Sequence, residues 1–328
     1  MKAIRYHQYG DSGVLAYEEA ERPVPGEGQV LVRVAGAAFN PVDAAIRAGY
    51  LREALPLAFP HVPGIDVAGT VAALGEGVQG WSVGDAVVAF LPMNAPGAAA
   101  EYVAVPADVL VRAPKAVDPA DAAALPVVGL TAWQALFEHA GLRAGQGVLV
   151  NGAGGAVGGY AVQLAHQAGA GVTATAGPRS AARVRGYGAD RIIDYTAAPV
   201  TEAADAQFDV VLNLVITSPE ETARLVALVR DGGVLVSTTG PAPEGPARGV
   251  RTVRMFVRSD ARELAELVAR VDAGTLHVHV AERVALADLP EVHARSDAGT
   301  LPGKTVAVVE PLTQDTGVSG GGPPTATA

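Results

Sequence analysis

Residues 148–159 read VLVNGAGGAVGG, and residues 160–165 continue as YAVQLA. A short apolar run is followed by a glycine cluster, and the cluster by an apolar pattern with helical spacing. This order is typical of a strand, a tight turn and a helix whose first N–H groups bind a pyrophosphate. The glycines follow G-x-x-G-x-x-G at Gly152, Gly155 and Gly158, because Val157 occupies the last glycine position of G-x-G-x-x-G. The turn therefore predicts a dinucleotide site, although such a corner can also be purely structural.

The region around this turn alternates between strand-like and helical patterns. Asp118 and Pro119 are expected to begin a linking helix that Pro126 ends. Strand-like runs follow at 147–150, 172–175, 191–193, 210–215, 234–237 and 251–257. Helical patterns lie at 155–168, 180–187, 219–230 and 260–271. Six strands with helical crossovers predict an α/β fold with a doubly wound parallel sheet over residues 118–271.

The flanking regions are different, because they are rich in short strands. Runs at 30–35, 67–74, 86–90 and 102–106 are separated by Gly and Pro turns and predict a small barrel. Two later runs, at 277–284 and 304–310, are expected to rejoin this barrel, so that the parallel sheet is an insertion. The expected domains are residues 1–117 with 272–312, residues 118–271, and a flexible tail at 313–328.

Composition limits the function classes. The 328 residues include no cysteine, which excludes disulfides, thiolate catalysis and zinc sites with cysteine ligands. A formal net charge of −10 argues against nucleic acid as a partner. No apolar run of membrane-spanning length occurs, and residues 1–6 lack the apolar core of a signal peptide. The sequence therefore predicts a cytoplasmic protein with no membrane partner.

Cofactor preference is read from the end of the second predicted parallel strand. NAD-preferring sites place an acidic residue there, whereas residues 174–180 read ATAGPRS and contain no carboxylate. The small Gly177, the guanidinium of Arg179 and the hydroxyl of Ser180 suit a 2′-phosphate, and Arg183 lies one helical turn further on. NADPH is the predicted cofactor. The alternative is that both arginines are solvated charges at the start of a helix.

Several other segments carry a resemblance to a known family. They are NPVD at 40–43, IRAGY at 46–50, PGIDVAGTV at 63–71, Gly75 to Val78, Gly84 to Val87, LTAW at 130–133, GAD at 188–190, IDY at 193–195 and GK at 303–304. Together with the glycine turn, their order and spacing resemble the medium-chain dehydrogenase/reductase superfamily, in its zinc-free quinone oxidoreductase (zeta-crystallin-like) branch. Zinc-dependent relatives carry a Cys near position 40 and a His where this chain has Ile65.

The resemblance implies a fold and an activity. The expected fold is a GroES-like β-barrel catalytic domain with an inserted six-stranded Rossmann domain. The expected activity is metal-free hydride transfer from NADPH to a small hydrophobic acceptor, a quinone or an α,β-unsaturated carbonyl, which needs no Lewis acid. Two alternatives stay open. One is a discrete enoyl-thioester or polyketide-tailoring enoyl reductase, and the other is an NADPH-binding structural or regulatory protein without turnover.

The resemblance also assigns the expected cofactor contacts. The glycine turn supplies Gly152, Gly154, Gly155, Ala156 and Val157 to the pyrophosphate. The expected adenosine contacts are Gly177, Arg179, Ser180 and Tyr195. The groove and nicotinamide contacts are Thr131, Val215, Thr239, Gly240, Phe256, Val257 and Lys304. The run at 251–257 is also the expected edge of a homodimer.

The candidate catalytic residues are Asn40 and Tyr50. Asn40 is expected to donate a hydrogen bond to the acceptor carbonyl or to the cofactor. Tyr50 is expected to donate a proton or to cap the pocket, with a surface loop aromatic as the alternative. Asp43 is expected to fix the turn after Asn40. His277 and His279 are expected to share one face of a strand as a surface pair rather than as metal ligands, so no metal is predicted.

Overall fold

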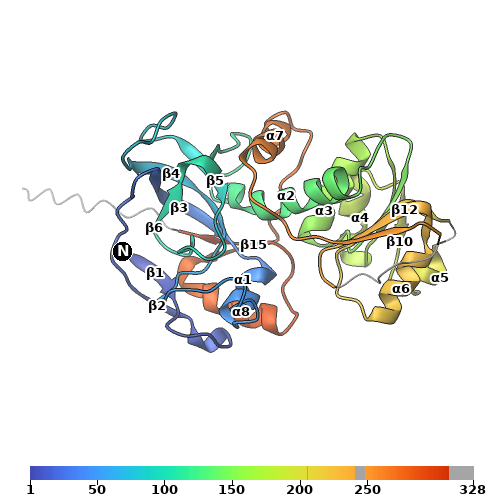
Figure 1. Ribbon diagram of the computed structural model, residues 1–328, viewed down its shortest axis with the longest axis horizontal. Coiled ribbons are helices and arrows are strands. Elements are labelled where there is room, and N and C mark those ends of the chain that lie inside the picture. Colours follow the sequence, from blue (N-terminus) through green and yellow to red (C-terminus); the bar gives the residue numbers. More distant parts are fainter. Residues whose placement is uncertain (205, 241–247, 310–328) are drawn as a thin grey trace, which may run out of the picture.

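The computed structural model describes residues 1–204, 206–240 and 248–309, which form two lobes joined by a central helix (Figure 1). One lobe holds a six-stranded parallel sheet in the order β10-β9-β8-β11-β12-β13. Its strands are β8 (Gly147–Asn151), β9 (Gly171–Thr175), β10 (Arg191–Ile193), β11 (Phe208–Asn213), β12 (Val229–Ser237) and β13 (Arg251–Arg254). The predicted six-stranded, doubly wound sheet is therefore confirmed.

Strand β13 is shorter than the sequence predicts. The apolar run continues to Val257, but β13 pairs only with Val234–Ser237 of β12, and β12 ends at Ser237. Met255 N–H still donates to Ser237 O at 2.9 Å, but β12 ends there, so residues 256 and 257 have no strand beside them on this ladder.

The helices of this lobe are α3 (Ala156–Gln167), α4 (Pro178–Gly186), α5 (Val200–Ala203) and α6 (Pro219–Ala227), while α7 (Ala261–Asp272) packs against α2 (Pro126–Trp133) and β7 (Val111–Arg112) (Figure 1). Capping fixes several of their starts. The Asp260 carboxylate accepts the N–H groups of Arg262 and Glu263 and begins α7, as its sequence predicts. Ser218 accepts the N–H of Glu221, and that glutamate returns a bond to Ser218 N, a capping box that begins α6.

The linking segment differs from its prediction. Asp118 accepts the N–H of Ala120 and closes only a turn, followed by the 3₁₀ turn η3 (Asp121–Ala124). Pro126 then begins α2 (Pro126–Trp133) instead of ending a helix. The prediction was wrong because proline fits the first helical position, where its missing N–H costs no intrahelical bond. A π-helical segment, η4 (Gln134–His139), continues from α2.

The other lobe is antiparallel for the most part. Its seven-stranded sheet runs β14-β15-β3-β4-β5-β7, with β6 also on β3, and β1 and β2 form a separate hairpin. The strands are β1 (Lys2–Arg5), β2 (Ala16–Glu19), β3 (Gln29–Ala38), β4 (Asp66–Leu74), β5 (Ala86–Phe90), β6 (Tyr102–Pro106), β7 (Val111–Arg112), β14 (Glu282–Ala285) and β15 (Thr305–Val308). The helices and short turns are α1 (Pro41–Arg47), α8 (Leu289–Asp297), η1 (Ser12–Val14), η2 (Ala107–Val109) and η5 (Leu286–Asp288).

The late strands return to the early lobe. β15 pairs with β3, and Figure 1 shows α8 beside α1 although they are far apart in sequence. The parallel sheet is therefore inserted into the antiparallel lobe. The positions at which one domain passes into the other stay a prediction, and the predicted tail at 313–328 lies outside the described residues.

The predicted strand at 277–284 is mostly a loop. Only Glu282–Ala285 pairs, so His277 and His279 do not lie on a strand. The prediction was wrong because side chains of the parallel lobe take the backbone bonds of this segment. Gln163 Oε1 accepts the His277 N–H at 2.7 Å, and Gln163 Nε2 donates to His277 O at 3.2 Å.

One apolar core spans both lobes. It includes Ile65 and Phe90 from the antiparallel lobe, Leu130 from α2, and Val150 and Leu212 from the parallel sheet. The buried helix α2 thus fixes the two lobes against each other, which holds the carboxyl edge of the parallel sheet beside the barrel (Figure 1).

Candidate active site

Two glycines of the segment from β8 into α3 are required by the local geometry. Gly152 has a φ of +96°, a conformation that favours glycine, and its N–H donates to Thr175 Oγ1 at 2.8 Å. Gly155 is the N-cap of α3. A Cβ on Gly158 would overlap Gly152 O and come within 2.5 Å of Ala153 Cα. Only glycine lets α3 pack this closely against the turn.

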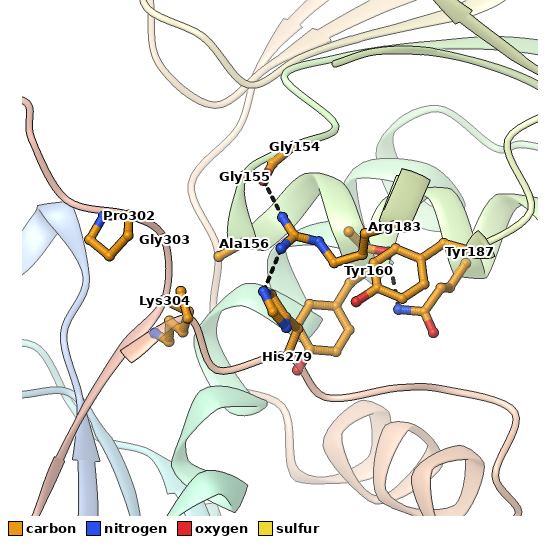
Figure 2. Close-up of a pocket in the computed structure, with 13 residues that line it drawn as sticks. Gly154, Gly155, Ala156, Tyr160, Arg183, Tyr187, His279, Pro302, Gly303 and Lys304 are labelled. Carbon is orange, nitrogen blue, oxygen red and sulfur yellow. Dashed lines mark hydrogen bonds between the residues drawn. The ribbon is translucent and has the colours of Figure 1, made fainter. Parts of the chain in front are cut away.

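The first turn of α3 opens into a pocket of about 350 Å³. Figure 2 shows Gly154, Gly155 and Ala156 on one side of it, and Pro302, Gly303 and Lys304 on the other. A Cβ on Gly154 would meet Ser180 Oγ at 2.5 Å, so the glycine lets the Ser180 side chain pack against the turn. Exposed N–H groups at the positive end of a helix suit a pyrophosphate, so these residues fit a dinucleotide.

The loop after β9 gathers three of the residues expected around the adenosine. Gly177 is the N-cap of α4, and Ser180 Oγ donates to Gly177 O at 3.3 Å. A Cβ on Gly177 would lie 3.4 Å from the Tyr195 hydroxyl, and Tyr195 is 57% exposed. Arg179 is exposed at the start of α4, and its side chain makes no hydrogen bond or ion pair with any described residue.

Arg183 does not join that group. Its Nη2 donates to Gly154 O at 2.9 Å and its Nη1 bonds His279 Nε2, so the guanidinium lies at the edge of the pocket (Figure 2). Burial, and secondarily the charge of Arg183, lower the pKa of His279. The bond to Gly154 O holds the Arg183 side chain against the glycine turn. Of the two arginines, only Arg179 is available for a phosphate.

A chain of amides and hydroxyls runs along the carboxyl edge of the parallel sheet. Thr175 Oγ1 donates to Asn151 Oδ1 at 3.0 Å, and Asn151 Nδ2 donates to Asn213 Oδ1 at 2.9 Å. Asn213 Nδ2 and Thr239 Oγ1 both donate to Val215 O. These bonds tie together the loops after four strands. Sequence reasoning missed them, although an Asn ends each of β8 and β11.

The remaining groove residues lie at this edge and between the lobes. Gly240 N–H donates to Ser237 Oγ at 3.4 Å, and no described atom lies within 4 Å of a Cβ built there. Phe256 is 71% exposed, with the Arg254 guanidinium 5.0 Å from its ring centroid, and Val257 packs against the core. Thr131 is buried on α2 and donates to Val127 O at 2.6 Å.

Asn40 lies in a buried polar network. It is 3% exposed, and its Nδ2 donates to Asp66 Oδ2 at 2.9 Å and to Ala38 O at 3.3 Å. Its Oδ1 accepts from Lys304 Nζ at 2.7 Å. Both side-chain N–H groups are therefore engaged inside the protein, and the geometry leaves none for the acceptor that the sequence assigned to it.

Lys304 and Asp66 form the centre of this network. Lys304 Nζ also donates to Asp66 Oδ2 at 2.8 Å and to Phe39 O at 3.2 Å, which uses all three of its protons. Asp66 Oδ1 accepts the N–H of Val127 in the first turn of α2. The pair connects β4 and the residue before β15 to the helix between the lobes. Lys304 thus lines the pocket at the glycine turn but has no N–H left to donate to a cofactor.

Asp43 and Tyr50 have opposite surroundings. Asp43 is buried and accepts the Asn40 N–H at 2.8 Å, which agrees with the predicted turn, and burial raises its pKa to about 7. Tyr50 is 84% exposed beyond the end of α1, and does not line the pocket at the glycine turn. The structure thus does not bring Tyr50 and Asn40 together.

Two family models match the chain. An "Alcohol dehydrogenase GroES-like domain" covers residues 26–115, and a "Zinc-binding dehydrogenase" domain covers residues 187–307. A quinone oxidoreductase of chloroplasts from Triphysaria versicolor is 33% identical over 327 residues, 95% of this chain and 98% of that protein. The chain belongs to the medium-chain dehydrogenase/reductase superfamily, in its quinone oxidoreductase branch.

Other relatives and a solved structure agree with that placement. A chloroplast envelope quinone oxidoreductase homolog of Arabidopsis thaliana is 43% identical over 60% of this chain and 61% of its own length. An NADPH-dependent alkenal/one oxidoreductase of the same organism is 38% identical over 84% of this chain and 70% of its own length. The quinone oxidoreductase of Coxiella burnetii has a TM-score of 0.84 and 28% identity, covering 94% of this chain and 99% of that one. This medium-chain reductase is an oxidoreductase that uses a nicotinamide cofactor.

One matched model is named for zinc, but this member of the superfamily has no cysteine to supply as a ligand. Ile65 is buried in the core. Within residues 1–204, 206–240 and 248–309, no group of three or more His, Cys, Asp or Glu side chains is placed to hold a metal. Over those same ranges, none of the helices combines the length and apolarity needed to cross a membrane.

Proposed function

We propose that this protein is an NADPH-dependent, metal-free reductase that reduces a quinone or an α,β-unsaturated carbonyl. The observation that carries the proposal is the pocket at the first turn of α3, beside an α4 start that offers Arg179 and no carboxylate. An exposed guanidinium without a described partner favours a 2′-phosphate over a 2′-hydroxyl. The relative named as an NADPH-dependent alkenal/one oxidoreductase supports the same preference.

The chain's own groups have separable roles in this proposal. Backbone N–H groups of residues 154–157 bind the pyrophosphate at the start of α3. Arg179 and Ser180 bind the 2′-phosphate, and the Tyr195 ring covers the adenine. When bound, NADPH supplies a hydride from its nicotinamide. Thr131, Val215, Thr239, Gly240, Phe256 and Val257 line the groove between the lobes and orient the ring.

The buried network of Lys304, Asp66 and Asn40 positions the elements around it and takes no part in the reaction. Lys304, Asp66 and Asn40 hold α1, β4 and the start of α2 in fixed relation. We therefore assign Asn40 a positioning role. A conjugated carbonyl already polarises its double bond, so a proton from water or from a weak donor completes its reduction without a Lewis acid.

Steady-state oxidation of NADPH with a panel of acceptors tests the proposal. The panel should contain benzoquinone, naphthoquinones, enals and crotonyl thioesters, because these separate the possible acceptor classes. Turnover with quinones or enals is expected. Rapid turnover with crotonyl thioesters alone would favour a discrete enoyl-thioester reductase. Tight NADPH binding with no turnover of any acceptor would favour a structural or regulatory role instead.

A further inference from the structure

A second pocket lies in the antiparallel lobe. The pocket is surrounded by the residue after β1, by residues of α1, and by the loops before β4 and after β5. The sequence motifs at 40–43, 46–50 and 63–71 contribute some of these residues. Apolar walls come from Ile46, Val62, Ile65 and Met93. Its polar groups come from Tyr6, Asp43 and His61.

Tyr6 is the unusual member of this pocket. Its side chain is 0% exposed, and its hydroxyl has no hydrogen-bond partner among the described residues. A buried hydroxyl is costly to leave unpaired, so it points to a missing acceptor. Burial also raises the pKa of Tyr6 above its usual range, and the hydroxyl therefore stays protonated as a donor.

The fold fixes this hydroxyl in place. Tyr6 and His61 exchange both backbone bonds, at 3.0 and 2.9 Å, and their rings meet edge to face at 5.3 Å. Phe59 packs against Tyr6 with ring centroids 5.8 Å apart. Two backbone bonds and two ring contacts hold the Tyr6 side chain on one side of the pocket, which is the preorganisation that a binding group needs.

The charge state of the pocket limits what it can bind. Burial lowers the pKa of His61 to about 4, so its ring is neutral near pH 7. The ring nitrogens make no hydrogen bond to a described residue. Burial raises the pKa of the Asp43 carboxyl to about 7, and Asp66 and Lys304 are the charged groups that act on it. No described residue in the lining is a cation, which disfavours an anion. A small uncharged molecule with one hydrogen-bond acceptor fits the apolar walls best.

The second pocket is connected to the cofactor pocket through the buried network. Asp43 lines the second pocket and accepts the Asn40 N–H, while Asn40 Oδ1 accepts from Lys304. Lys304 in turn lines the pocket at the glycine turn. A chain of hydrogen bonds thus runs from a lining residue of one pocket to a lining residue of the other.

We propose that this second pocket binds the carbonyl end of the acceptor, with the Tyr6 hydroxyl donating to the carbonyl oxygen. The inference rests on the proposed function and names the substrate class by its chemistry: a small, uncharged conjugated carbonyl. Met93, Ile46 and Val62 then select for an apolar body next to that carbonyl. Tyr6 is a specificity-determining residue in this scheme.

The test is Tyr6→Phe, which removes the hydroxyl alone. The value of kcat/KM for benzoquinone or an enal should fall roughly tenfold, mainly through KM, while the Kd for NADPH is unchanged. The thermal midpoint should not fall, since no internal hydrogen bond is lost. Tyr9→Phe is the matched control, because the Tyr9 hydroxyl accepts from Leu57 N at 3.3 Å and Tyr9 does not line the pocket.

A second variant and a binding probe make the outcome decisive. Met93→Trp should obstruct the pocket and raise the acceptor KM without touching Tyr6. Cyclohexanone keeps the carbonyl but has no conjugated double bond, and it should inhibit the wild type competitively and Tyr6→Phe more weakly. If the wild type turns over and neither variant changes the acceptor KM or ketone inhibition, the inference is overturned. If none of the acceptors supports NADPH oxidation by the wild type, the proposed function fails. Even then, ligand-observed NMR that shows weaker cyclohexanone binding to Tyr6→Phe than to the wild type would support the pocket.

Discussion

Two arginines one helical turn apart on α4 differ in whether their guanidinium is available to a ligand. Arg183 is held by Gly154 O and His279, while Arg179 is exposed and unpaired among the described residues. The sequence placed both near a 2′-phosphate, because helical spacing puts both near the same end of β9. Only the fold shows that His279, from a distant loop, engages one of them.

Arg179→Ala should therefore weaken NADPH binding about tenfold and leave NADH binding nearly unchanged, because a charge-assisted bond to the 2′-phosphate is lost. Isothermal titration with both nucleotides measures the ratio. Arg185→Ala, exposed on the same helix, is the control. Equal losses for the two nucleotides would remove the phosphate role of Arg179.

Asp43 makes folding stability depend on pH. Burial raises its pKa to about 7, whereas its pKa in an unfolded chain is close to 3.8, the ordinary value for aspartate. Between these values the folded state binds more protons than the unfolded state, so stability falls as pH rises. The contribution is fully present below the unfolded pKa and is lost as pH rises through about 7.

Asp43→Asn should remove this dependence. Relative to the wild type, the variant should gain up to about 4 kcal/mol between about pH 4 and about pH 8. Urea unfolding at several pH values measures this difference in the free energy of unfolding. For Asp108→Asn, at an exposed position, the difference from the wild type should be the same at every pH. A pH-independent difference for Asp43→Asn would show that this carboxyl is ionised throughout the range.

At the scale of elements, the glycine turn was predictable and its boundaries were not. The spacing of Gly152, Gly155 and Gly158 predicted the order of strand, turn and helix, because Gly152 needs a positive φ and Gly158 a close backbone approach. The end of β13 and the start of α2 at Pro126 depend on neighbouring strands and helices, which one local pattern does not contain. For the same reason the buried Asp66–Lys304 pair was missed, since its partners lie 238 residues apart.

Gly158→Ala tests the turn. The added Cβ would overlap Gly152 O, a backbone atom that cannot turn away, so the variant should lose about 1–3 kcal/mol or more of stability. NADPH binding should weaken with it, because α3 must move off the turn. Gly155→Ala is the matched variant, since its Cβ would lie 3.4 Å from the same oxygen and its φ of −81° is ordinary. Comparable chemical denaturation curves for the two variants would contradict this account.

At the scale of the whole molecule, the edge of the parallel sheet has a predicted use. β13 pairs only with β12 among the described strands, which leaves its other edge open for a second copy. We expect a homodimer with a mass near twice 33.2 kDa. Light scattering after size exclusion measures it, and a single species at 33.2 kDa across micromolar concentrations would contradict the expectation.

The insertion of one sheet into another was visible in the sequence as a change from short strands to alternating strands and helices. The second pocket was not visible, because Tyr6, Asp43 and His61 meet only when the end of β1, α1 and the loop before β4 come together. The cytoplasmic location stays a prediction, and several relatives are named for the chloroplast.

Binding of the reduced cofactor tests the central claim most directly, because every proposed role depends on the pocket at the first turn of α3. Titration of the purified protein with NADPH by calorimetry should give one site per chain with micromolar affinity, and NADH should bind more weakly. Absence of any heat of binding with either nucleotide at millimolar concentration would contradict the claim that this turn holds a dinucleotide.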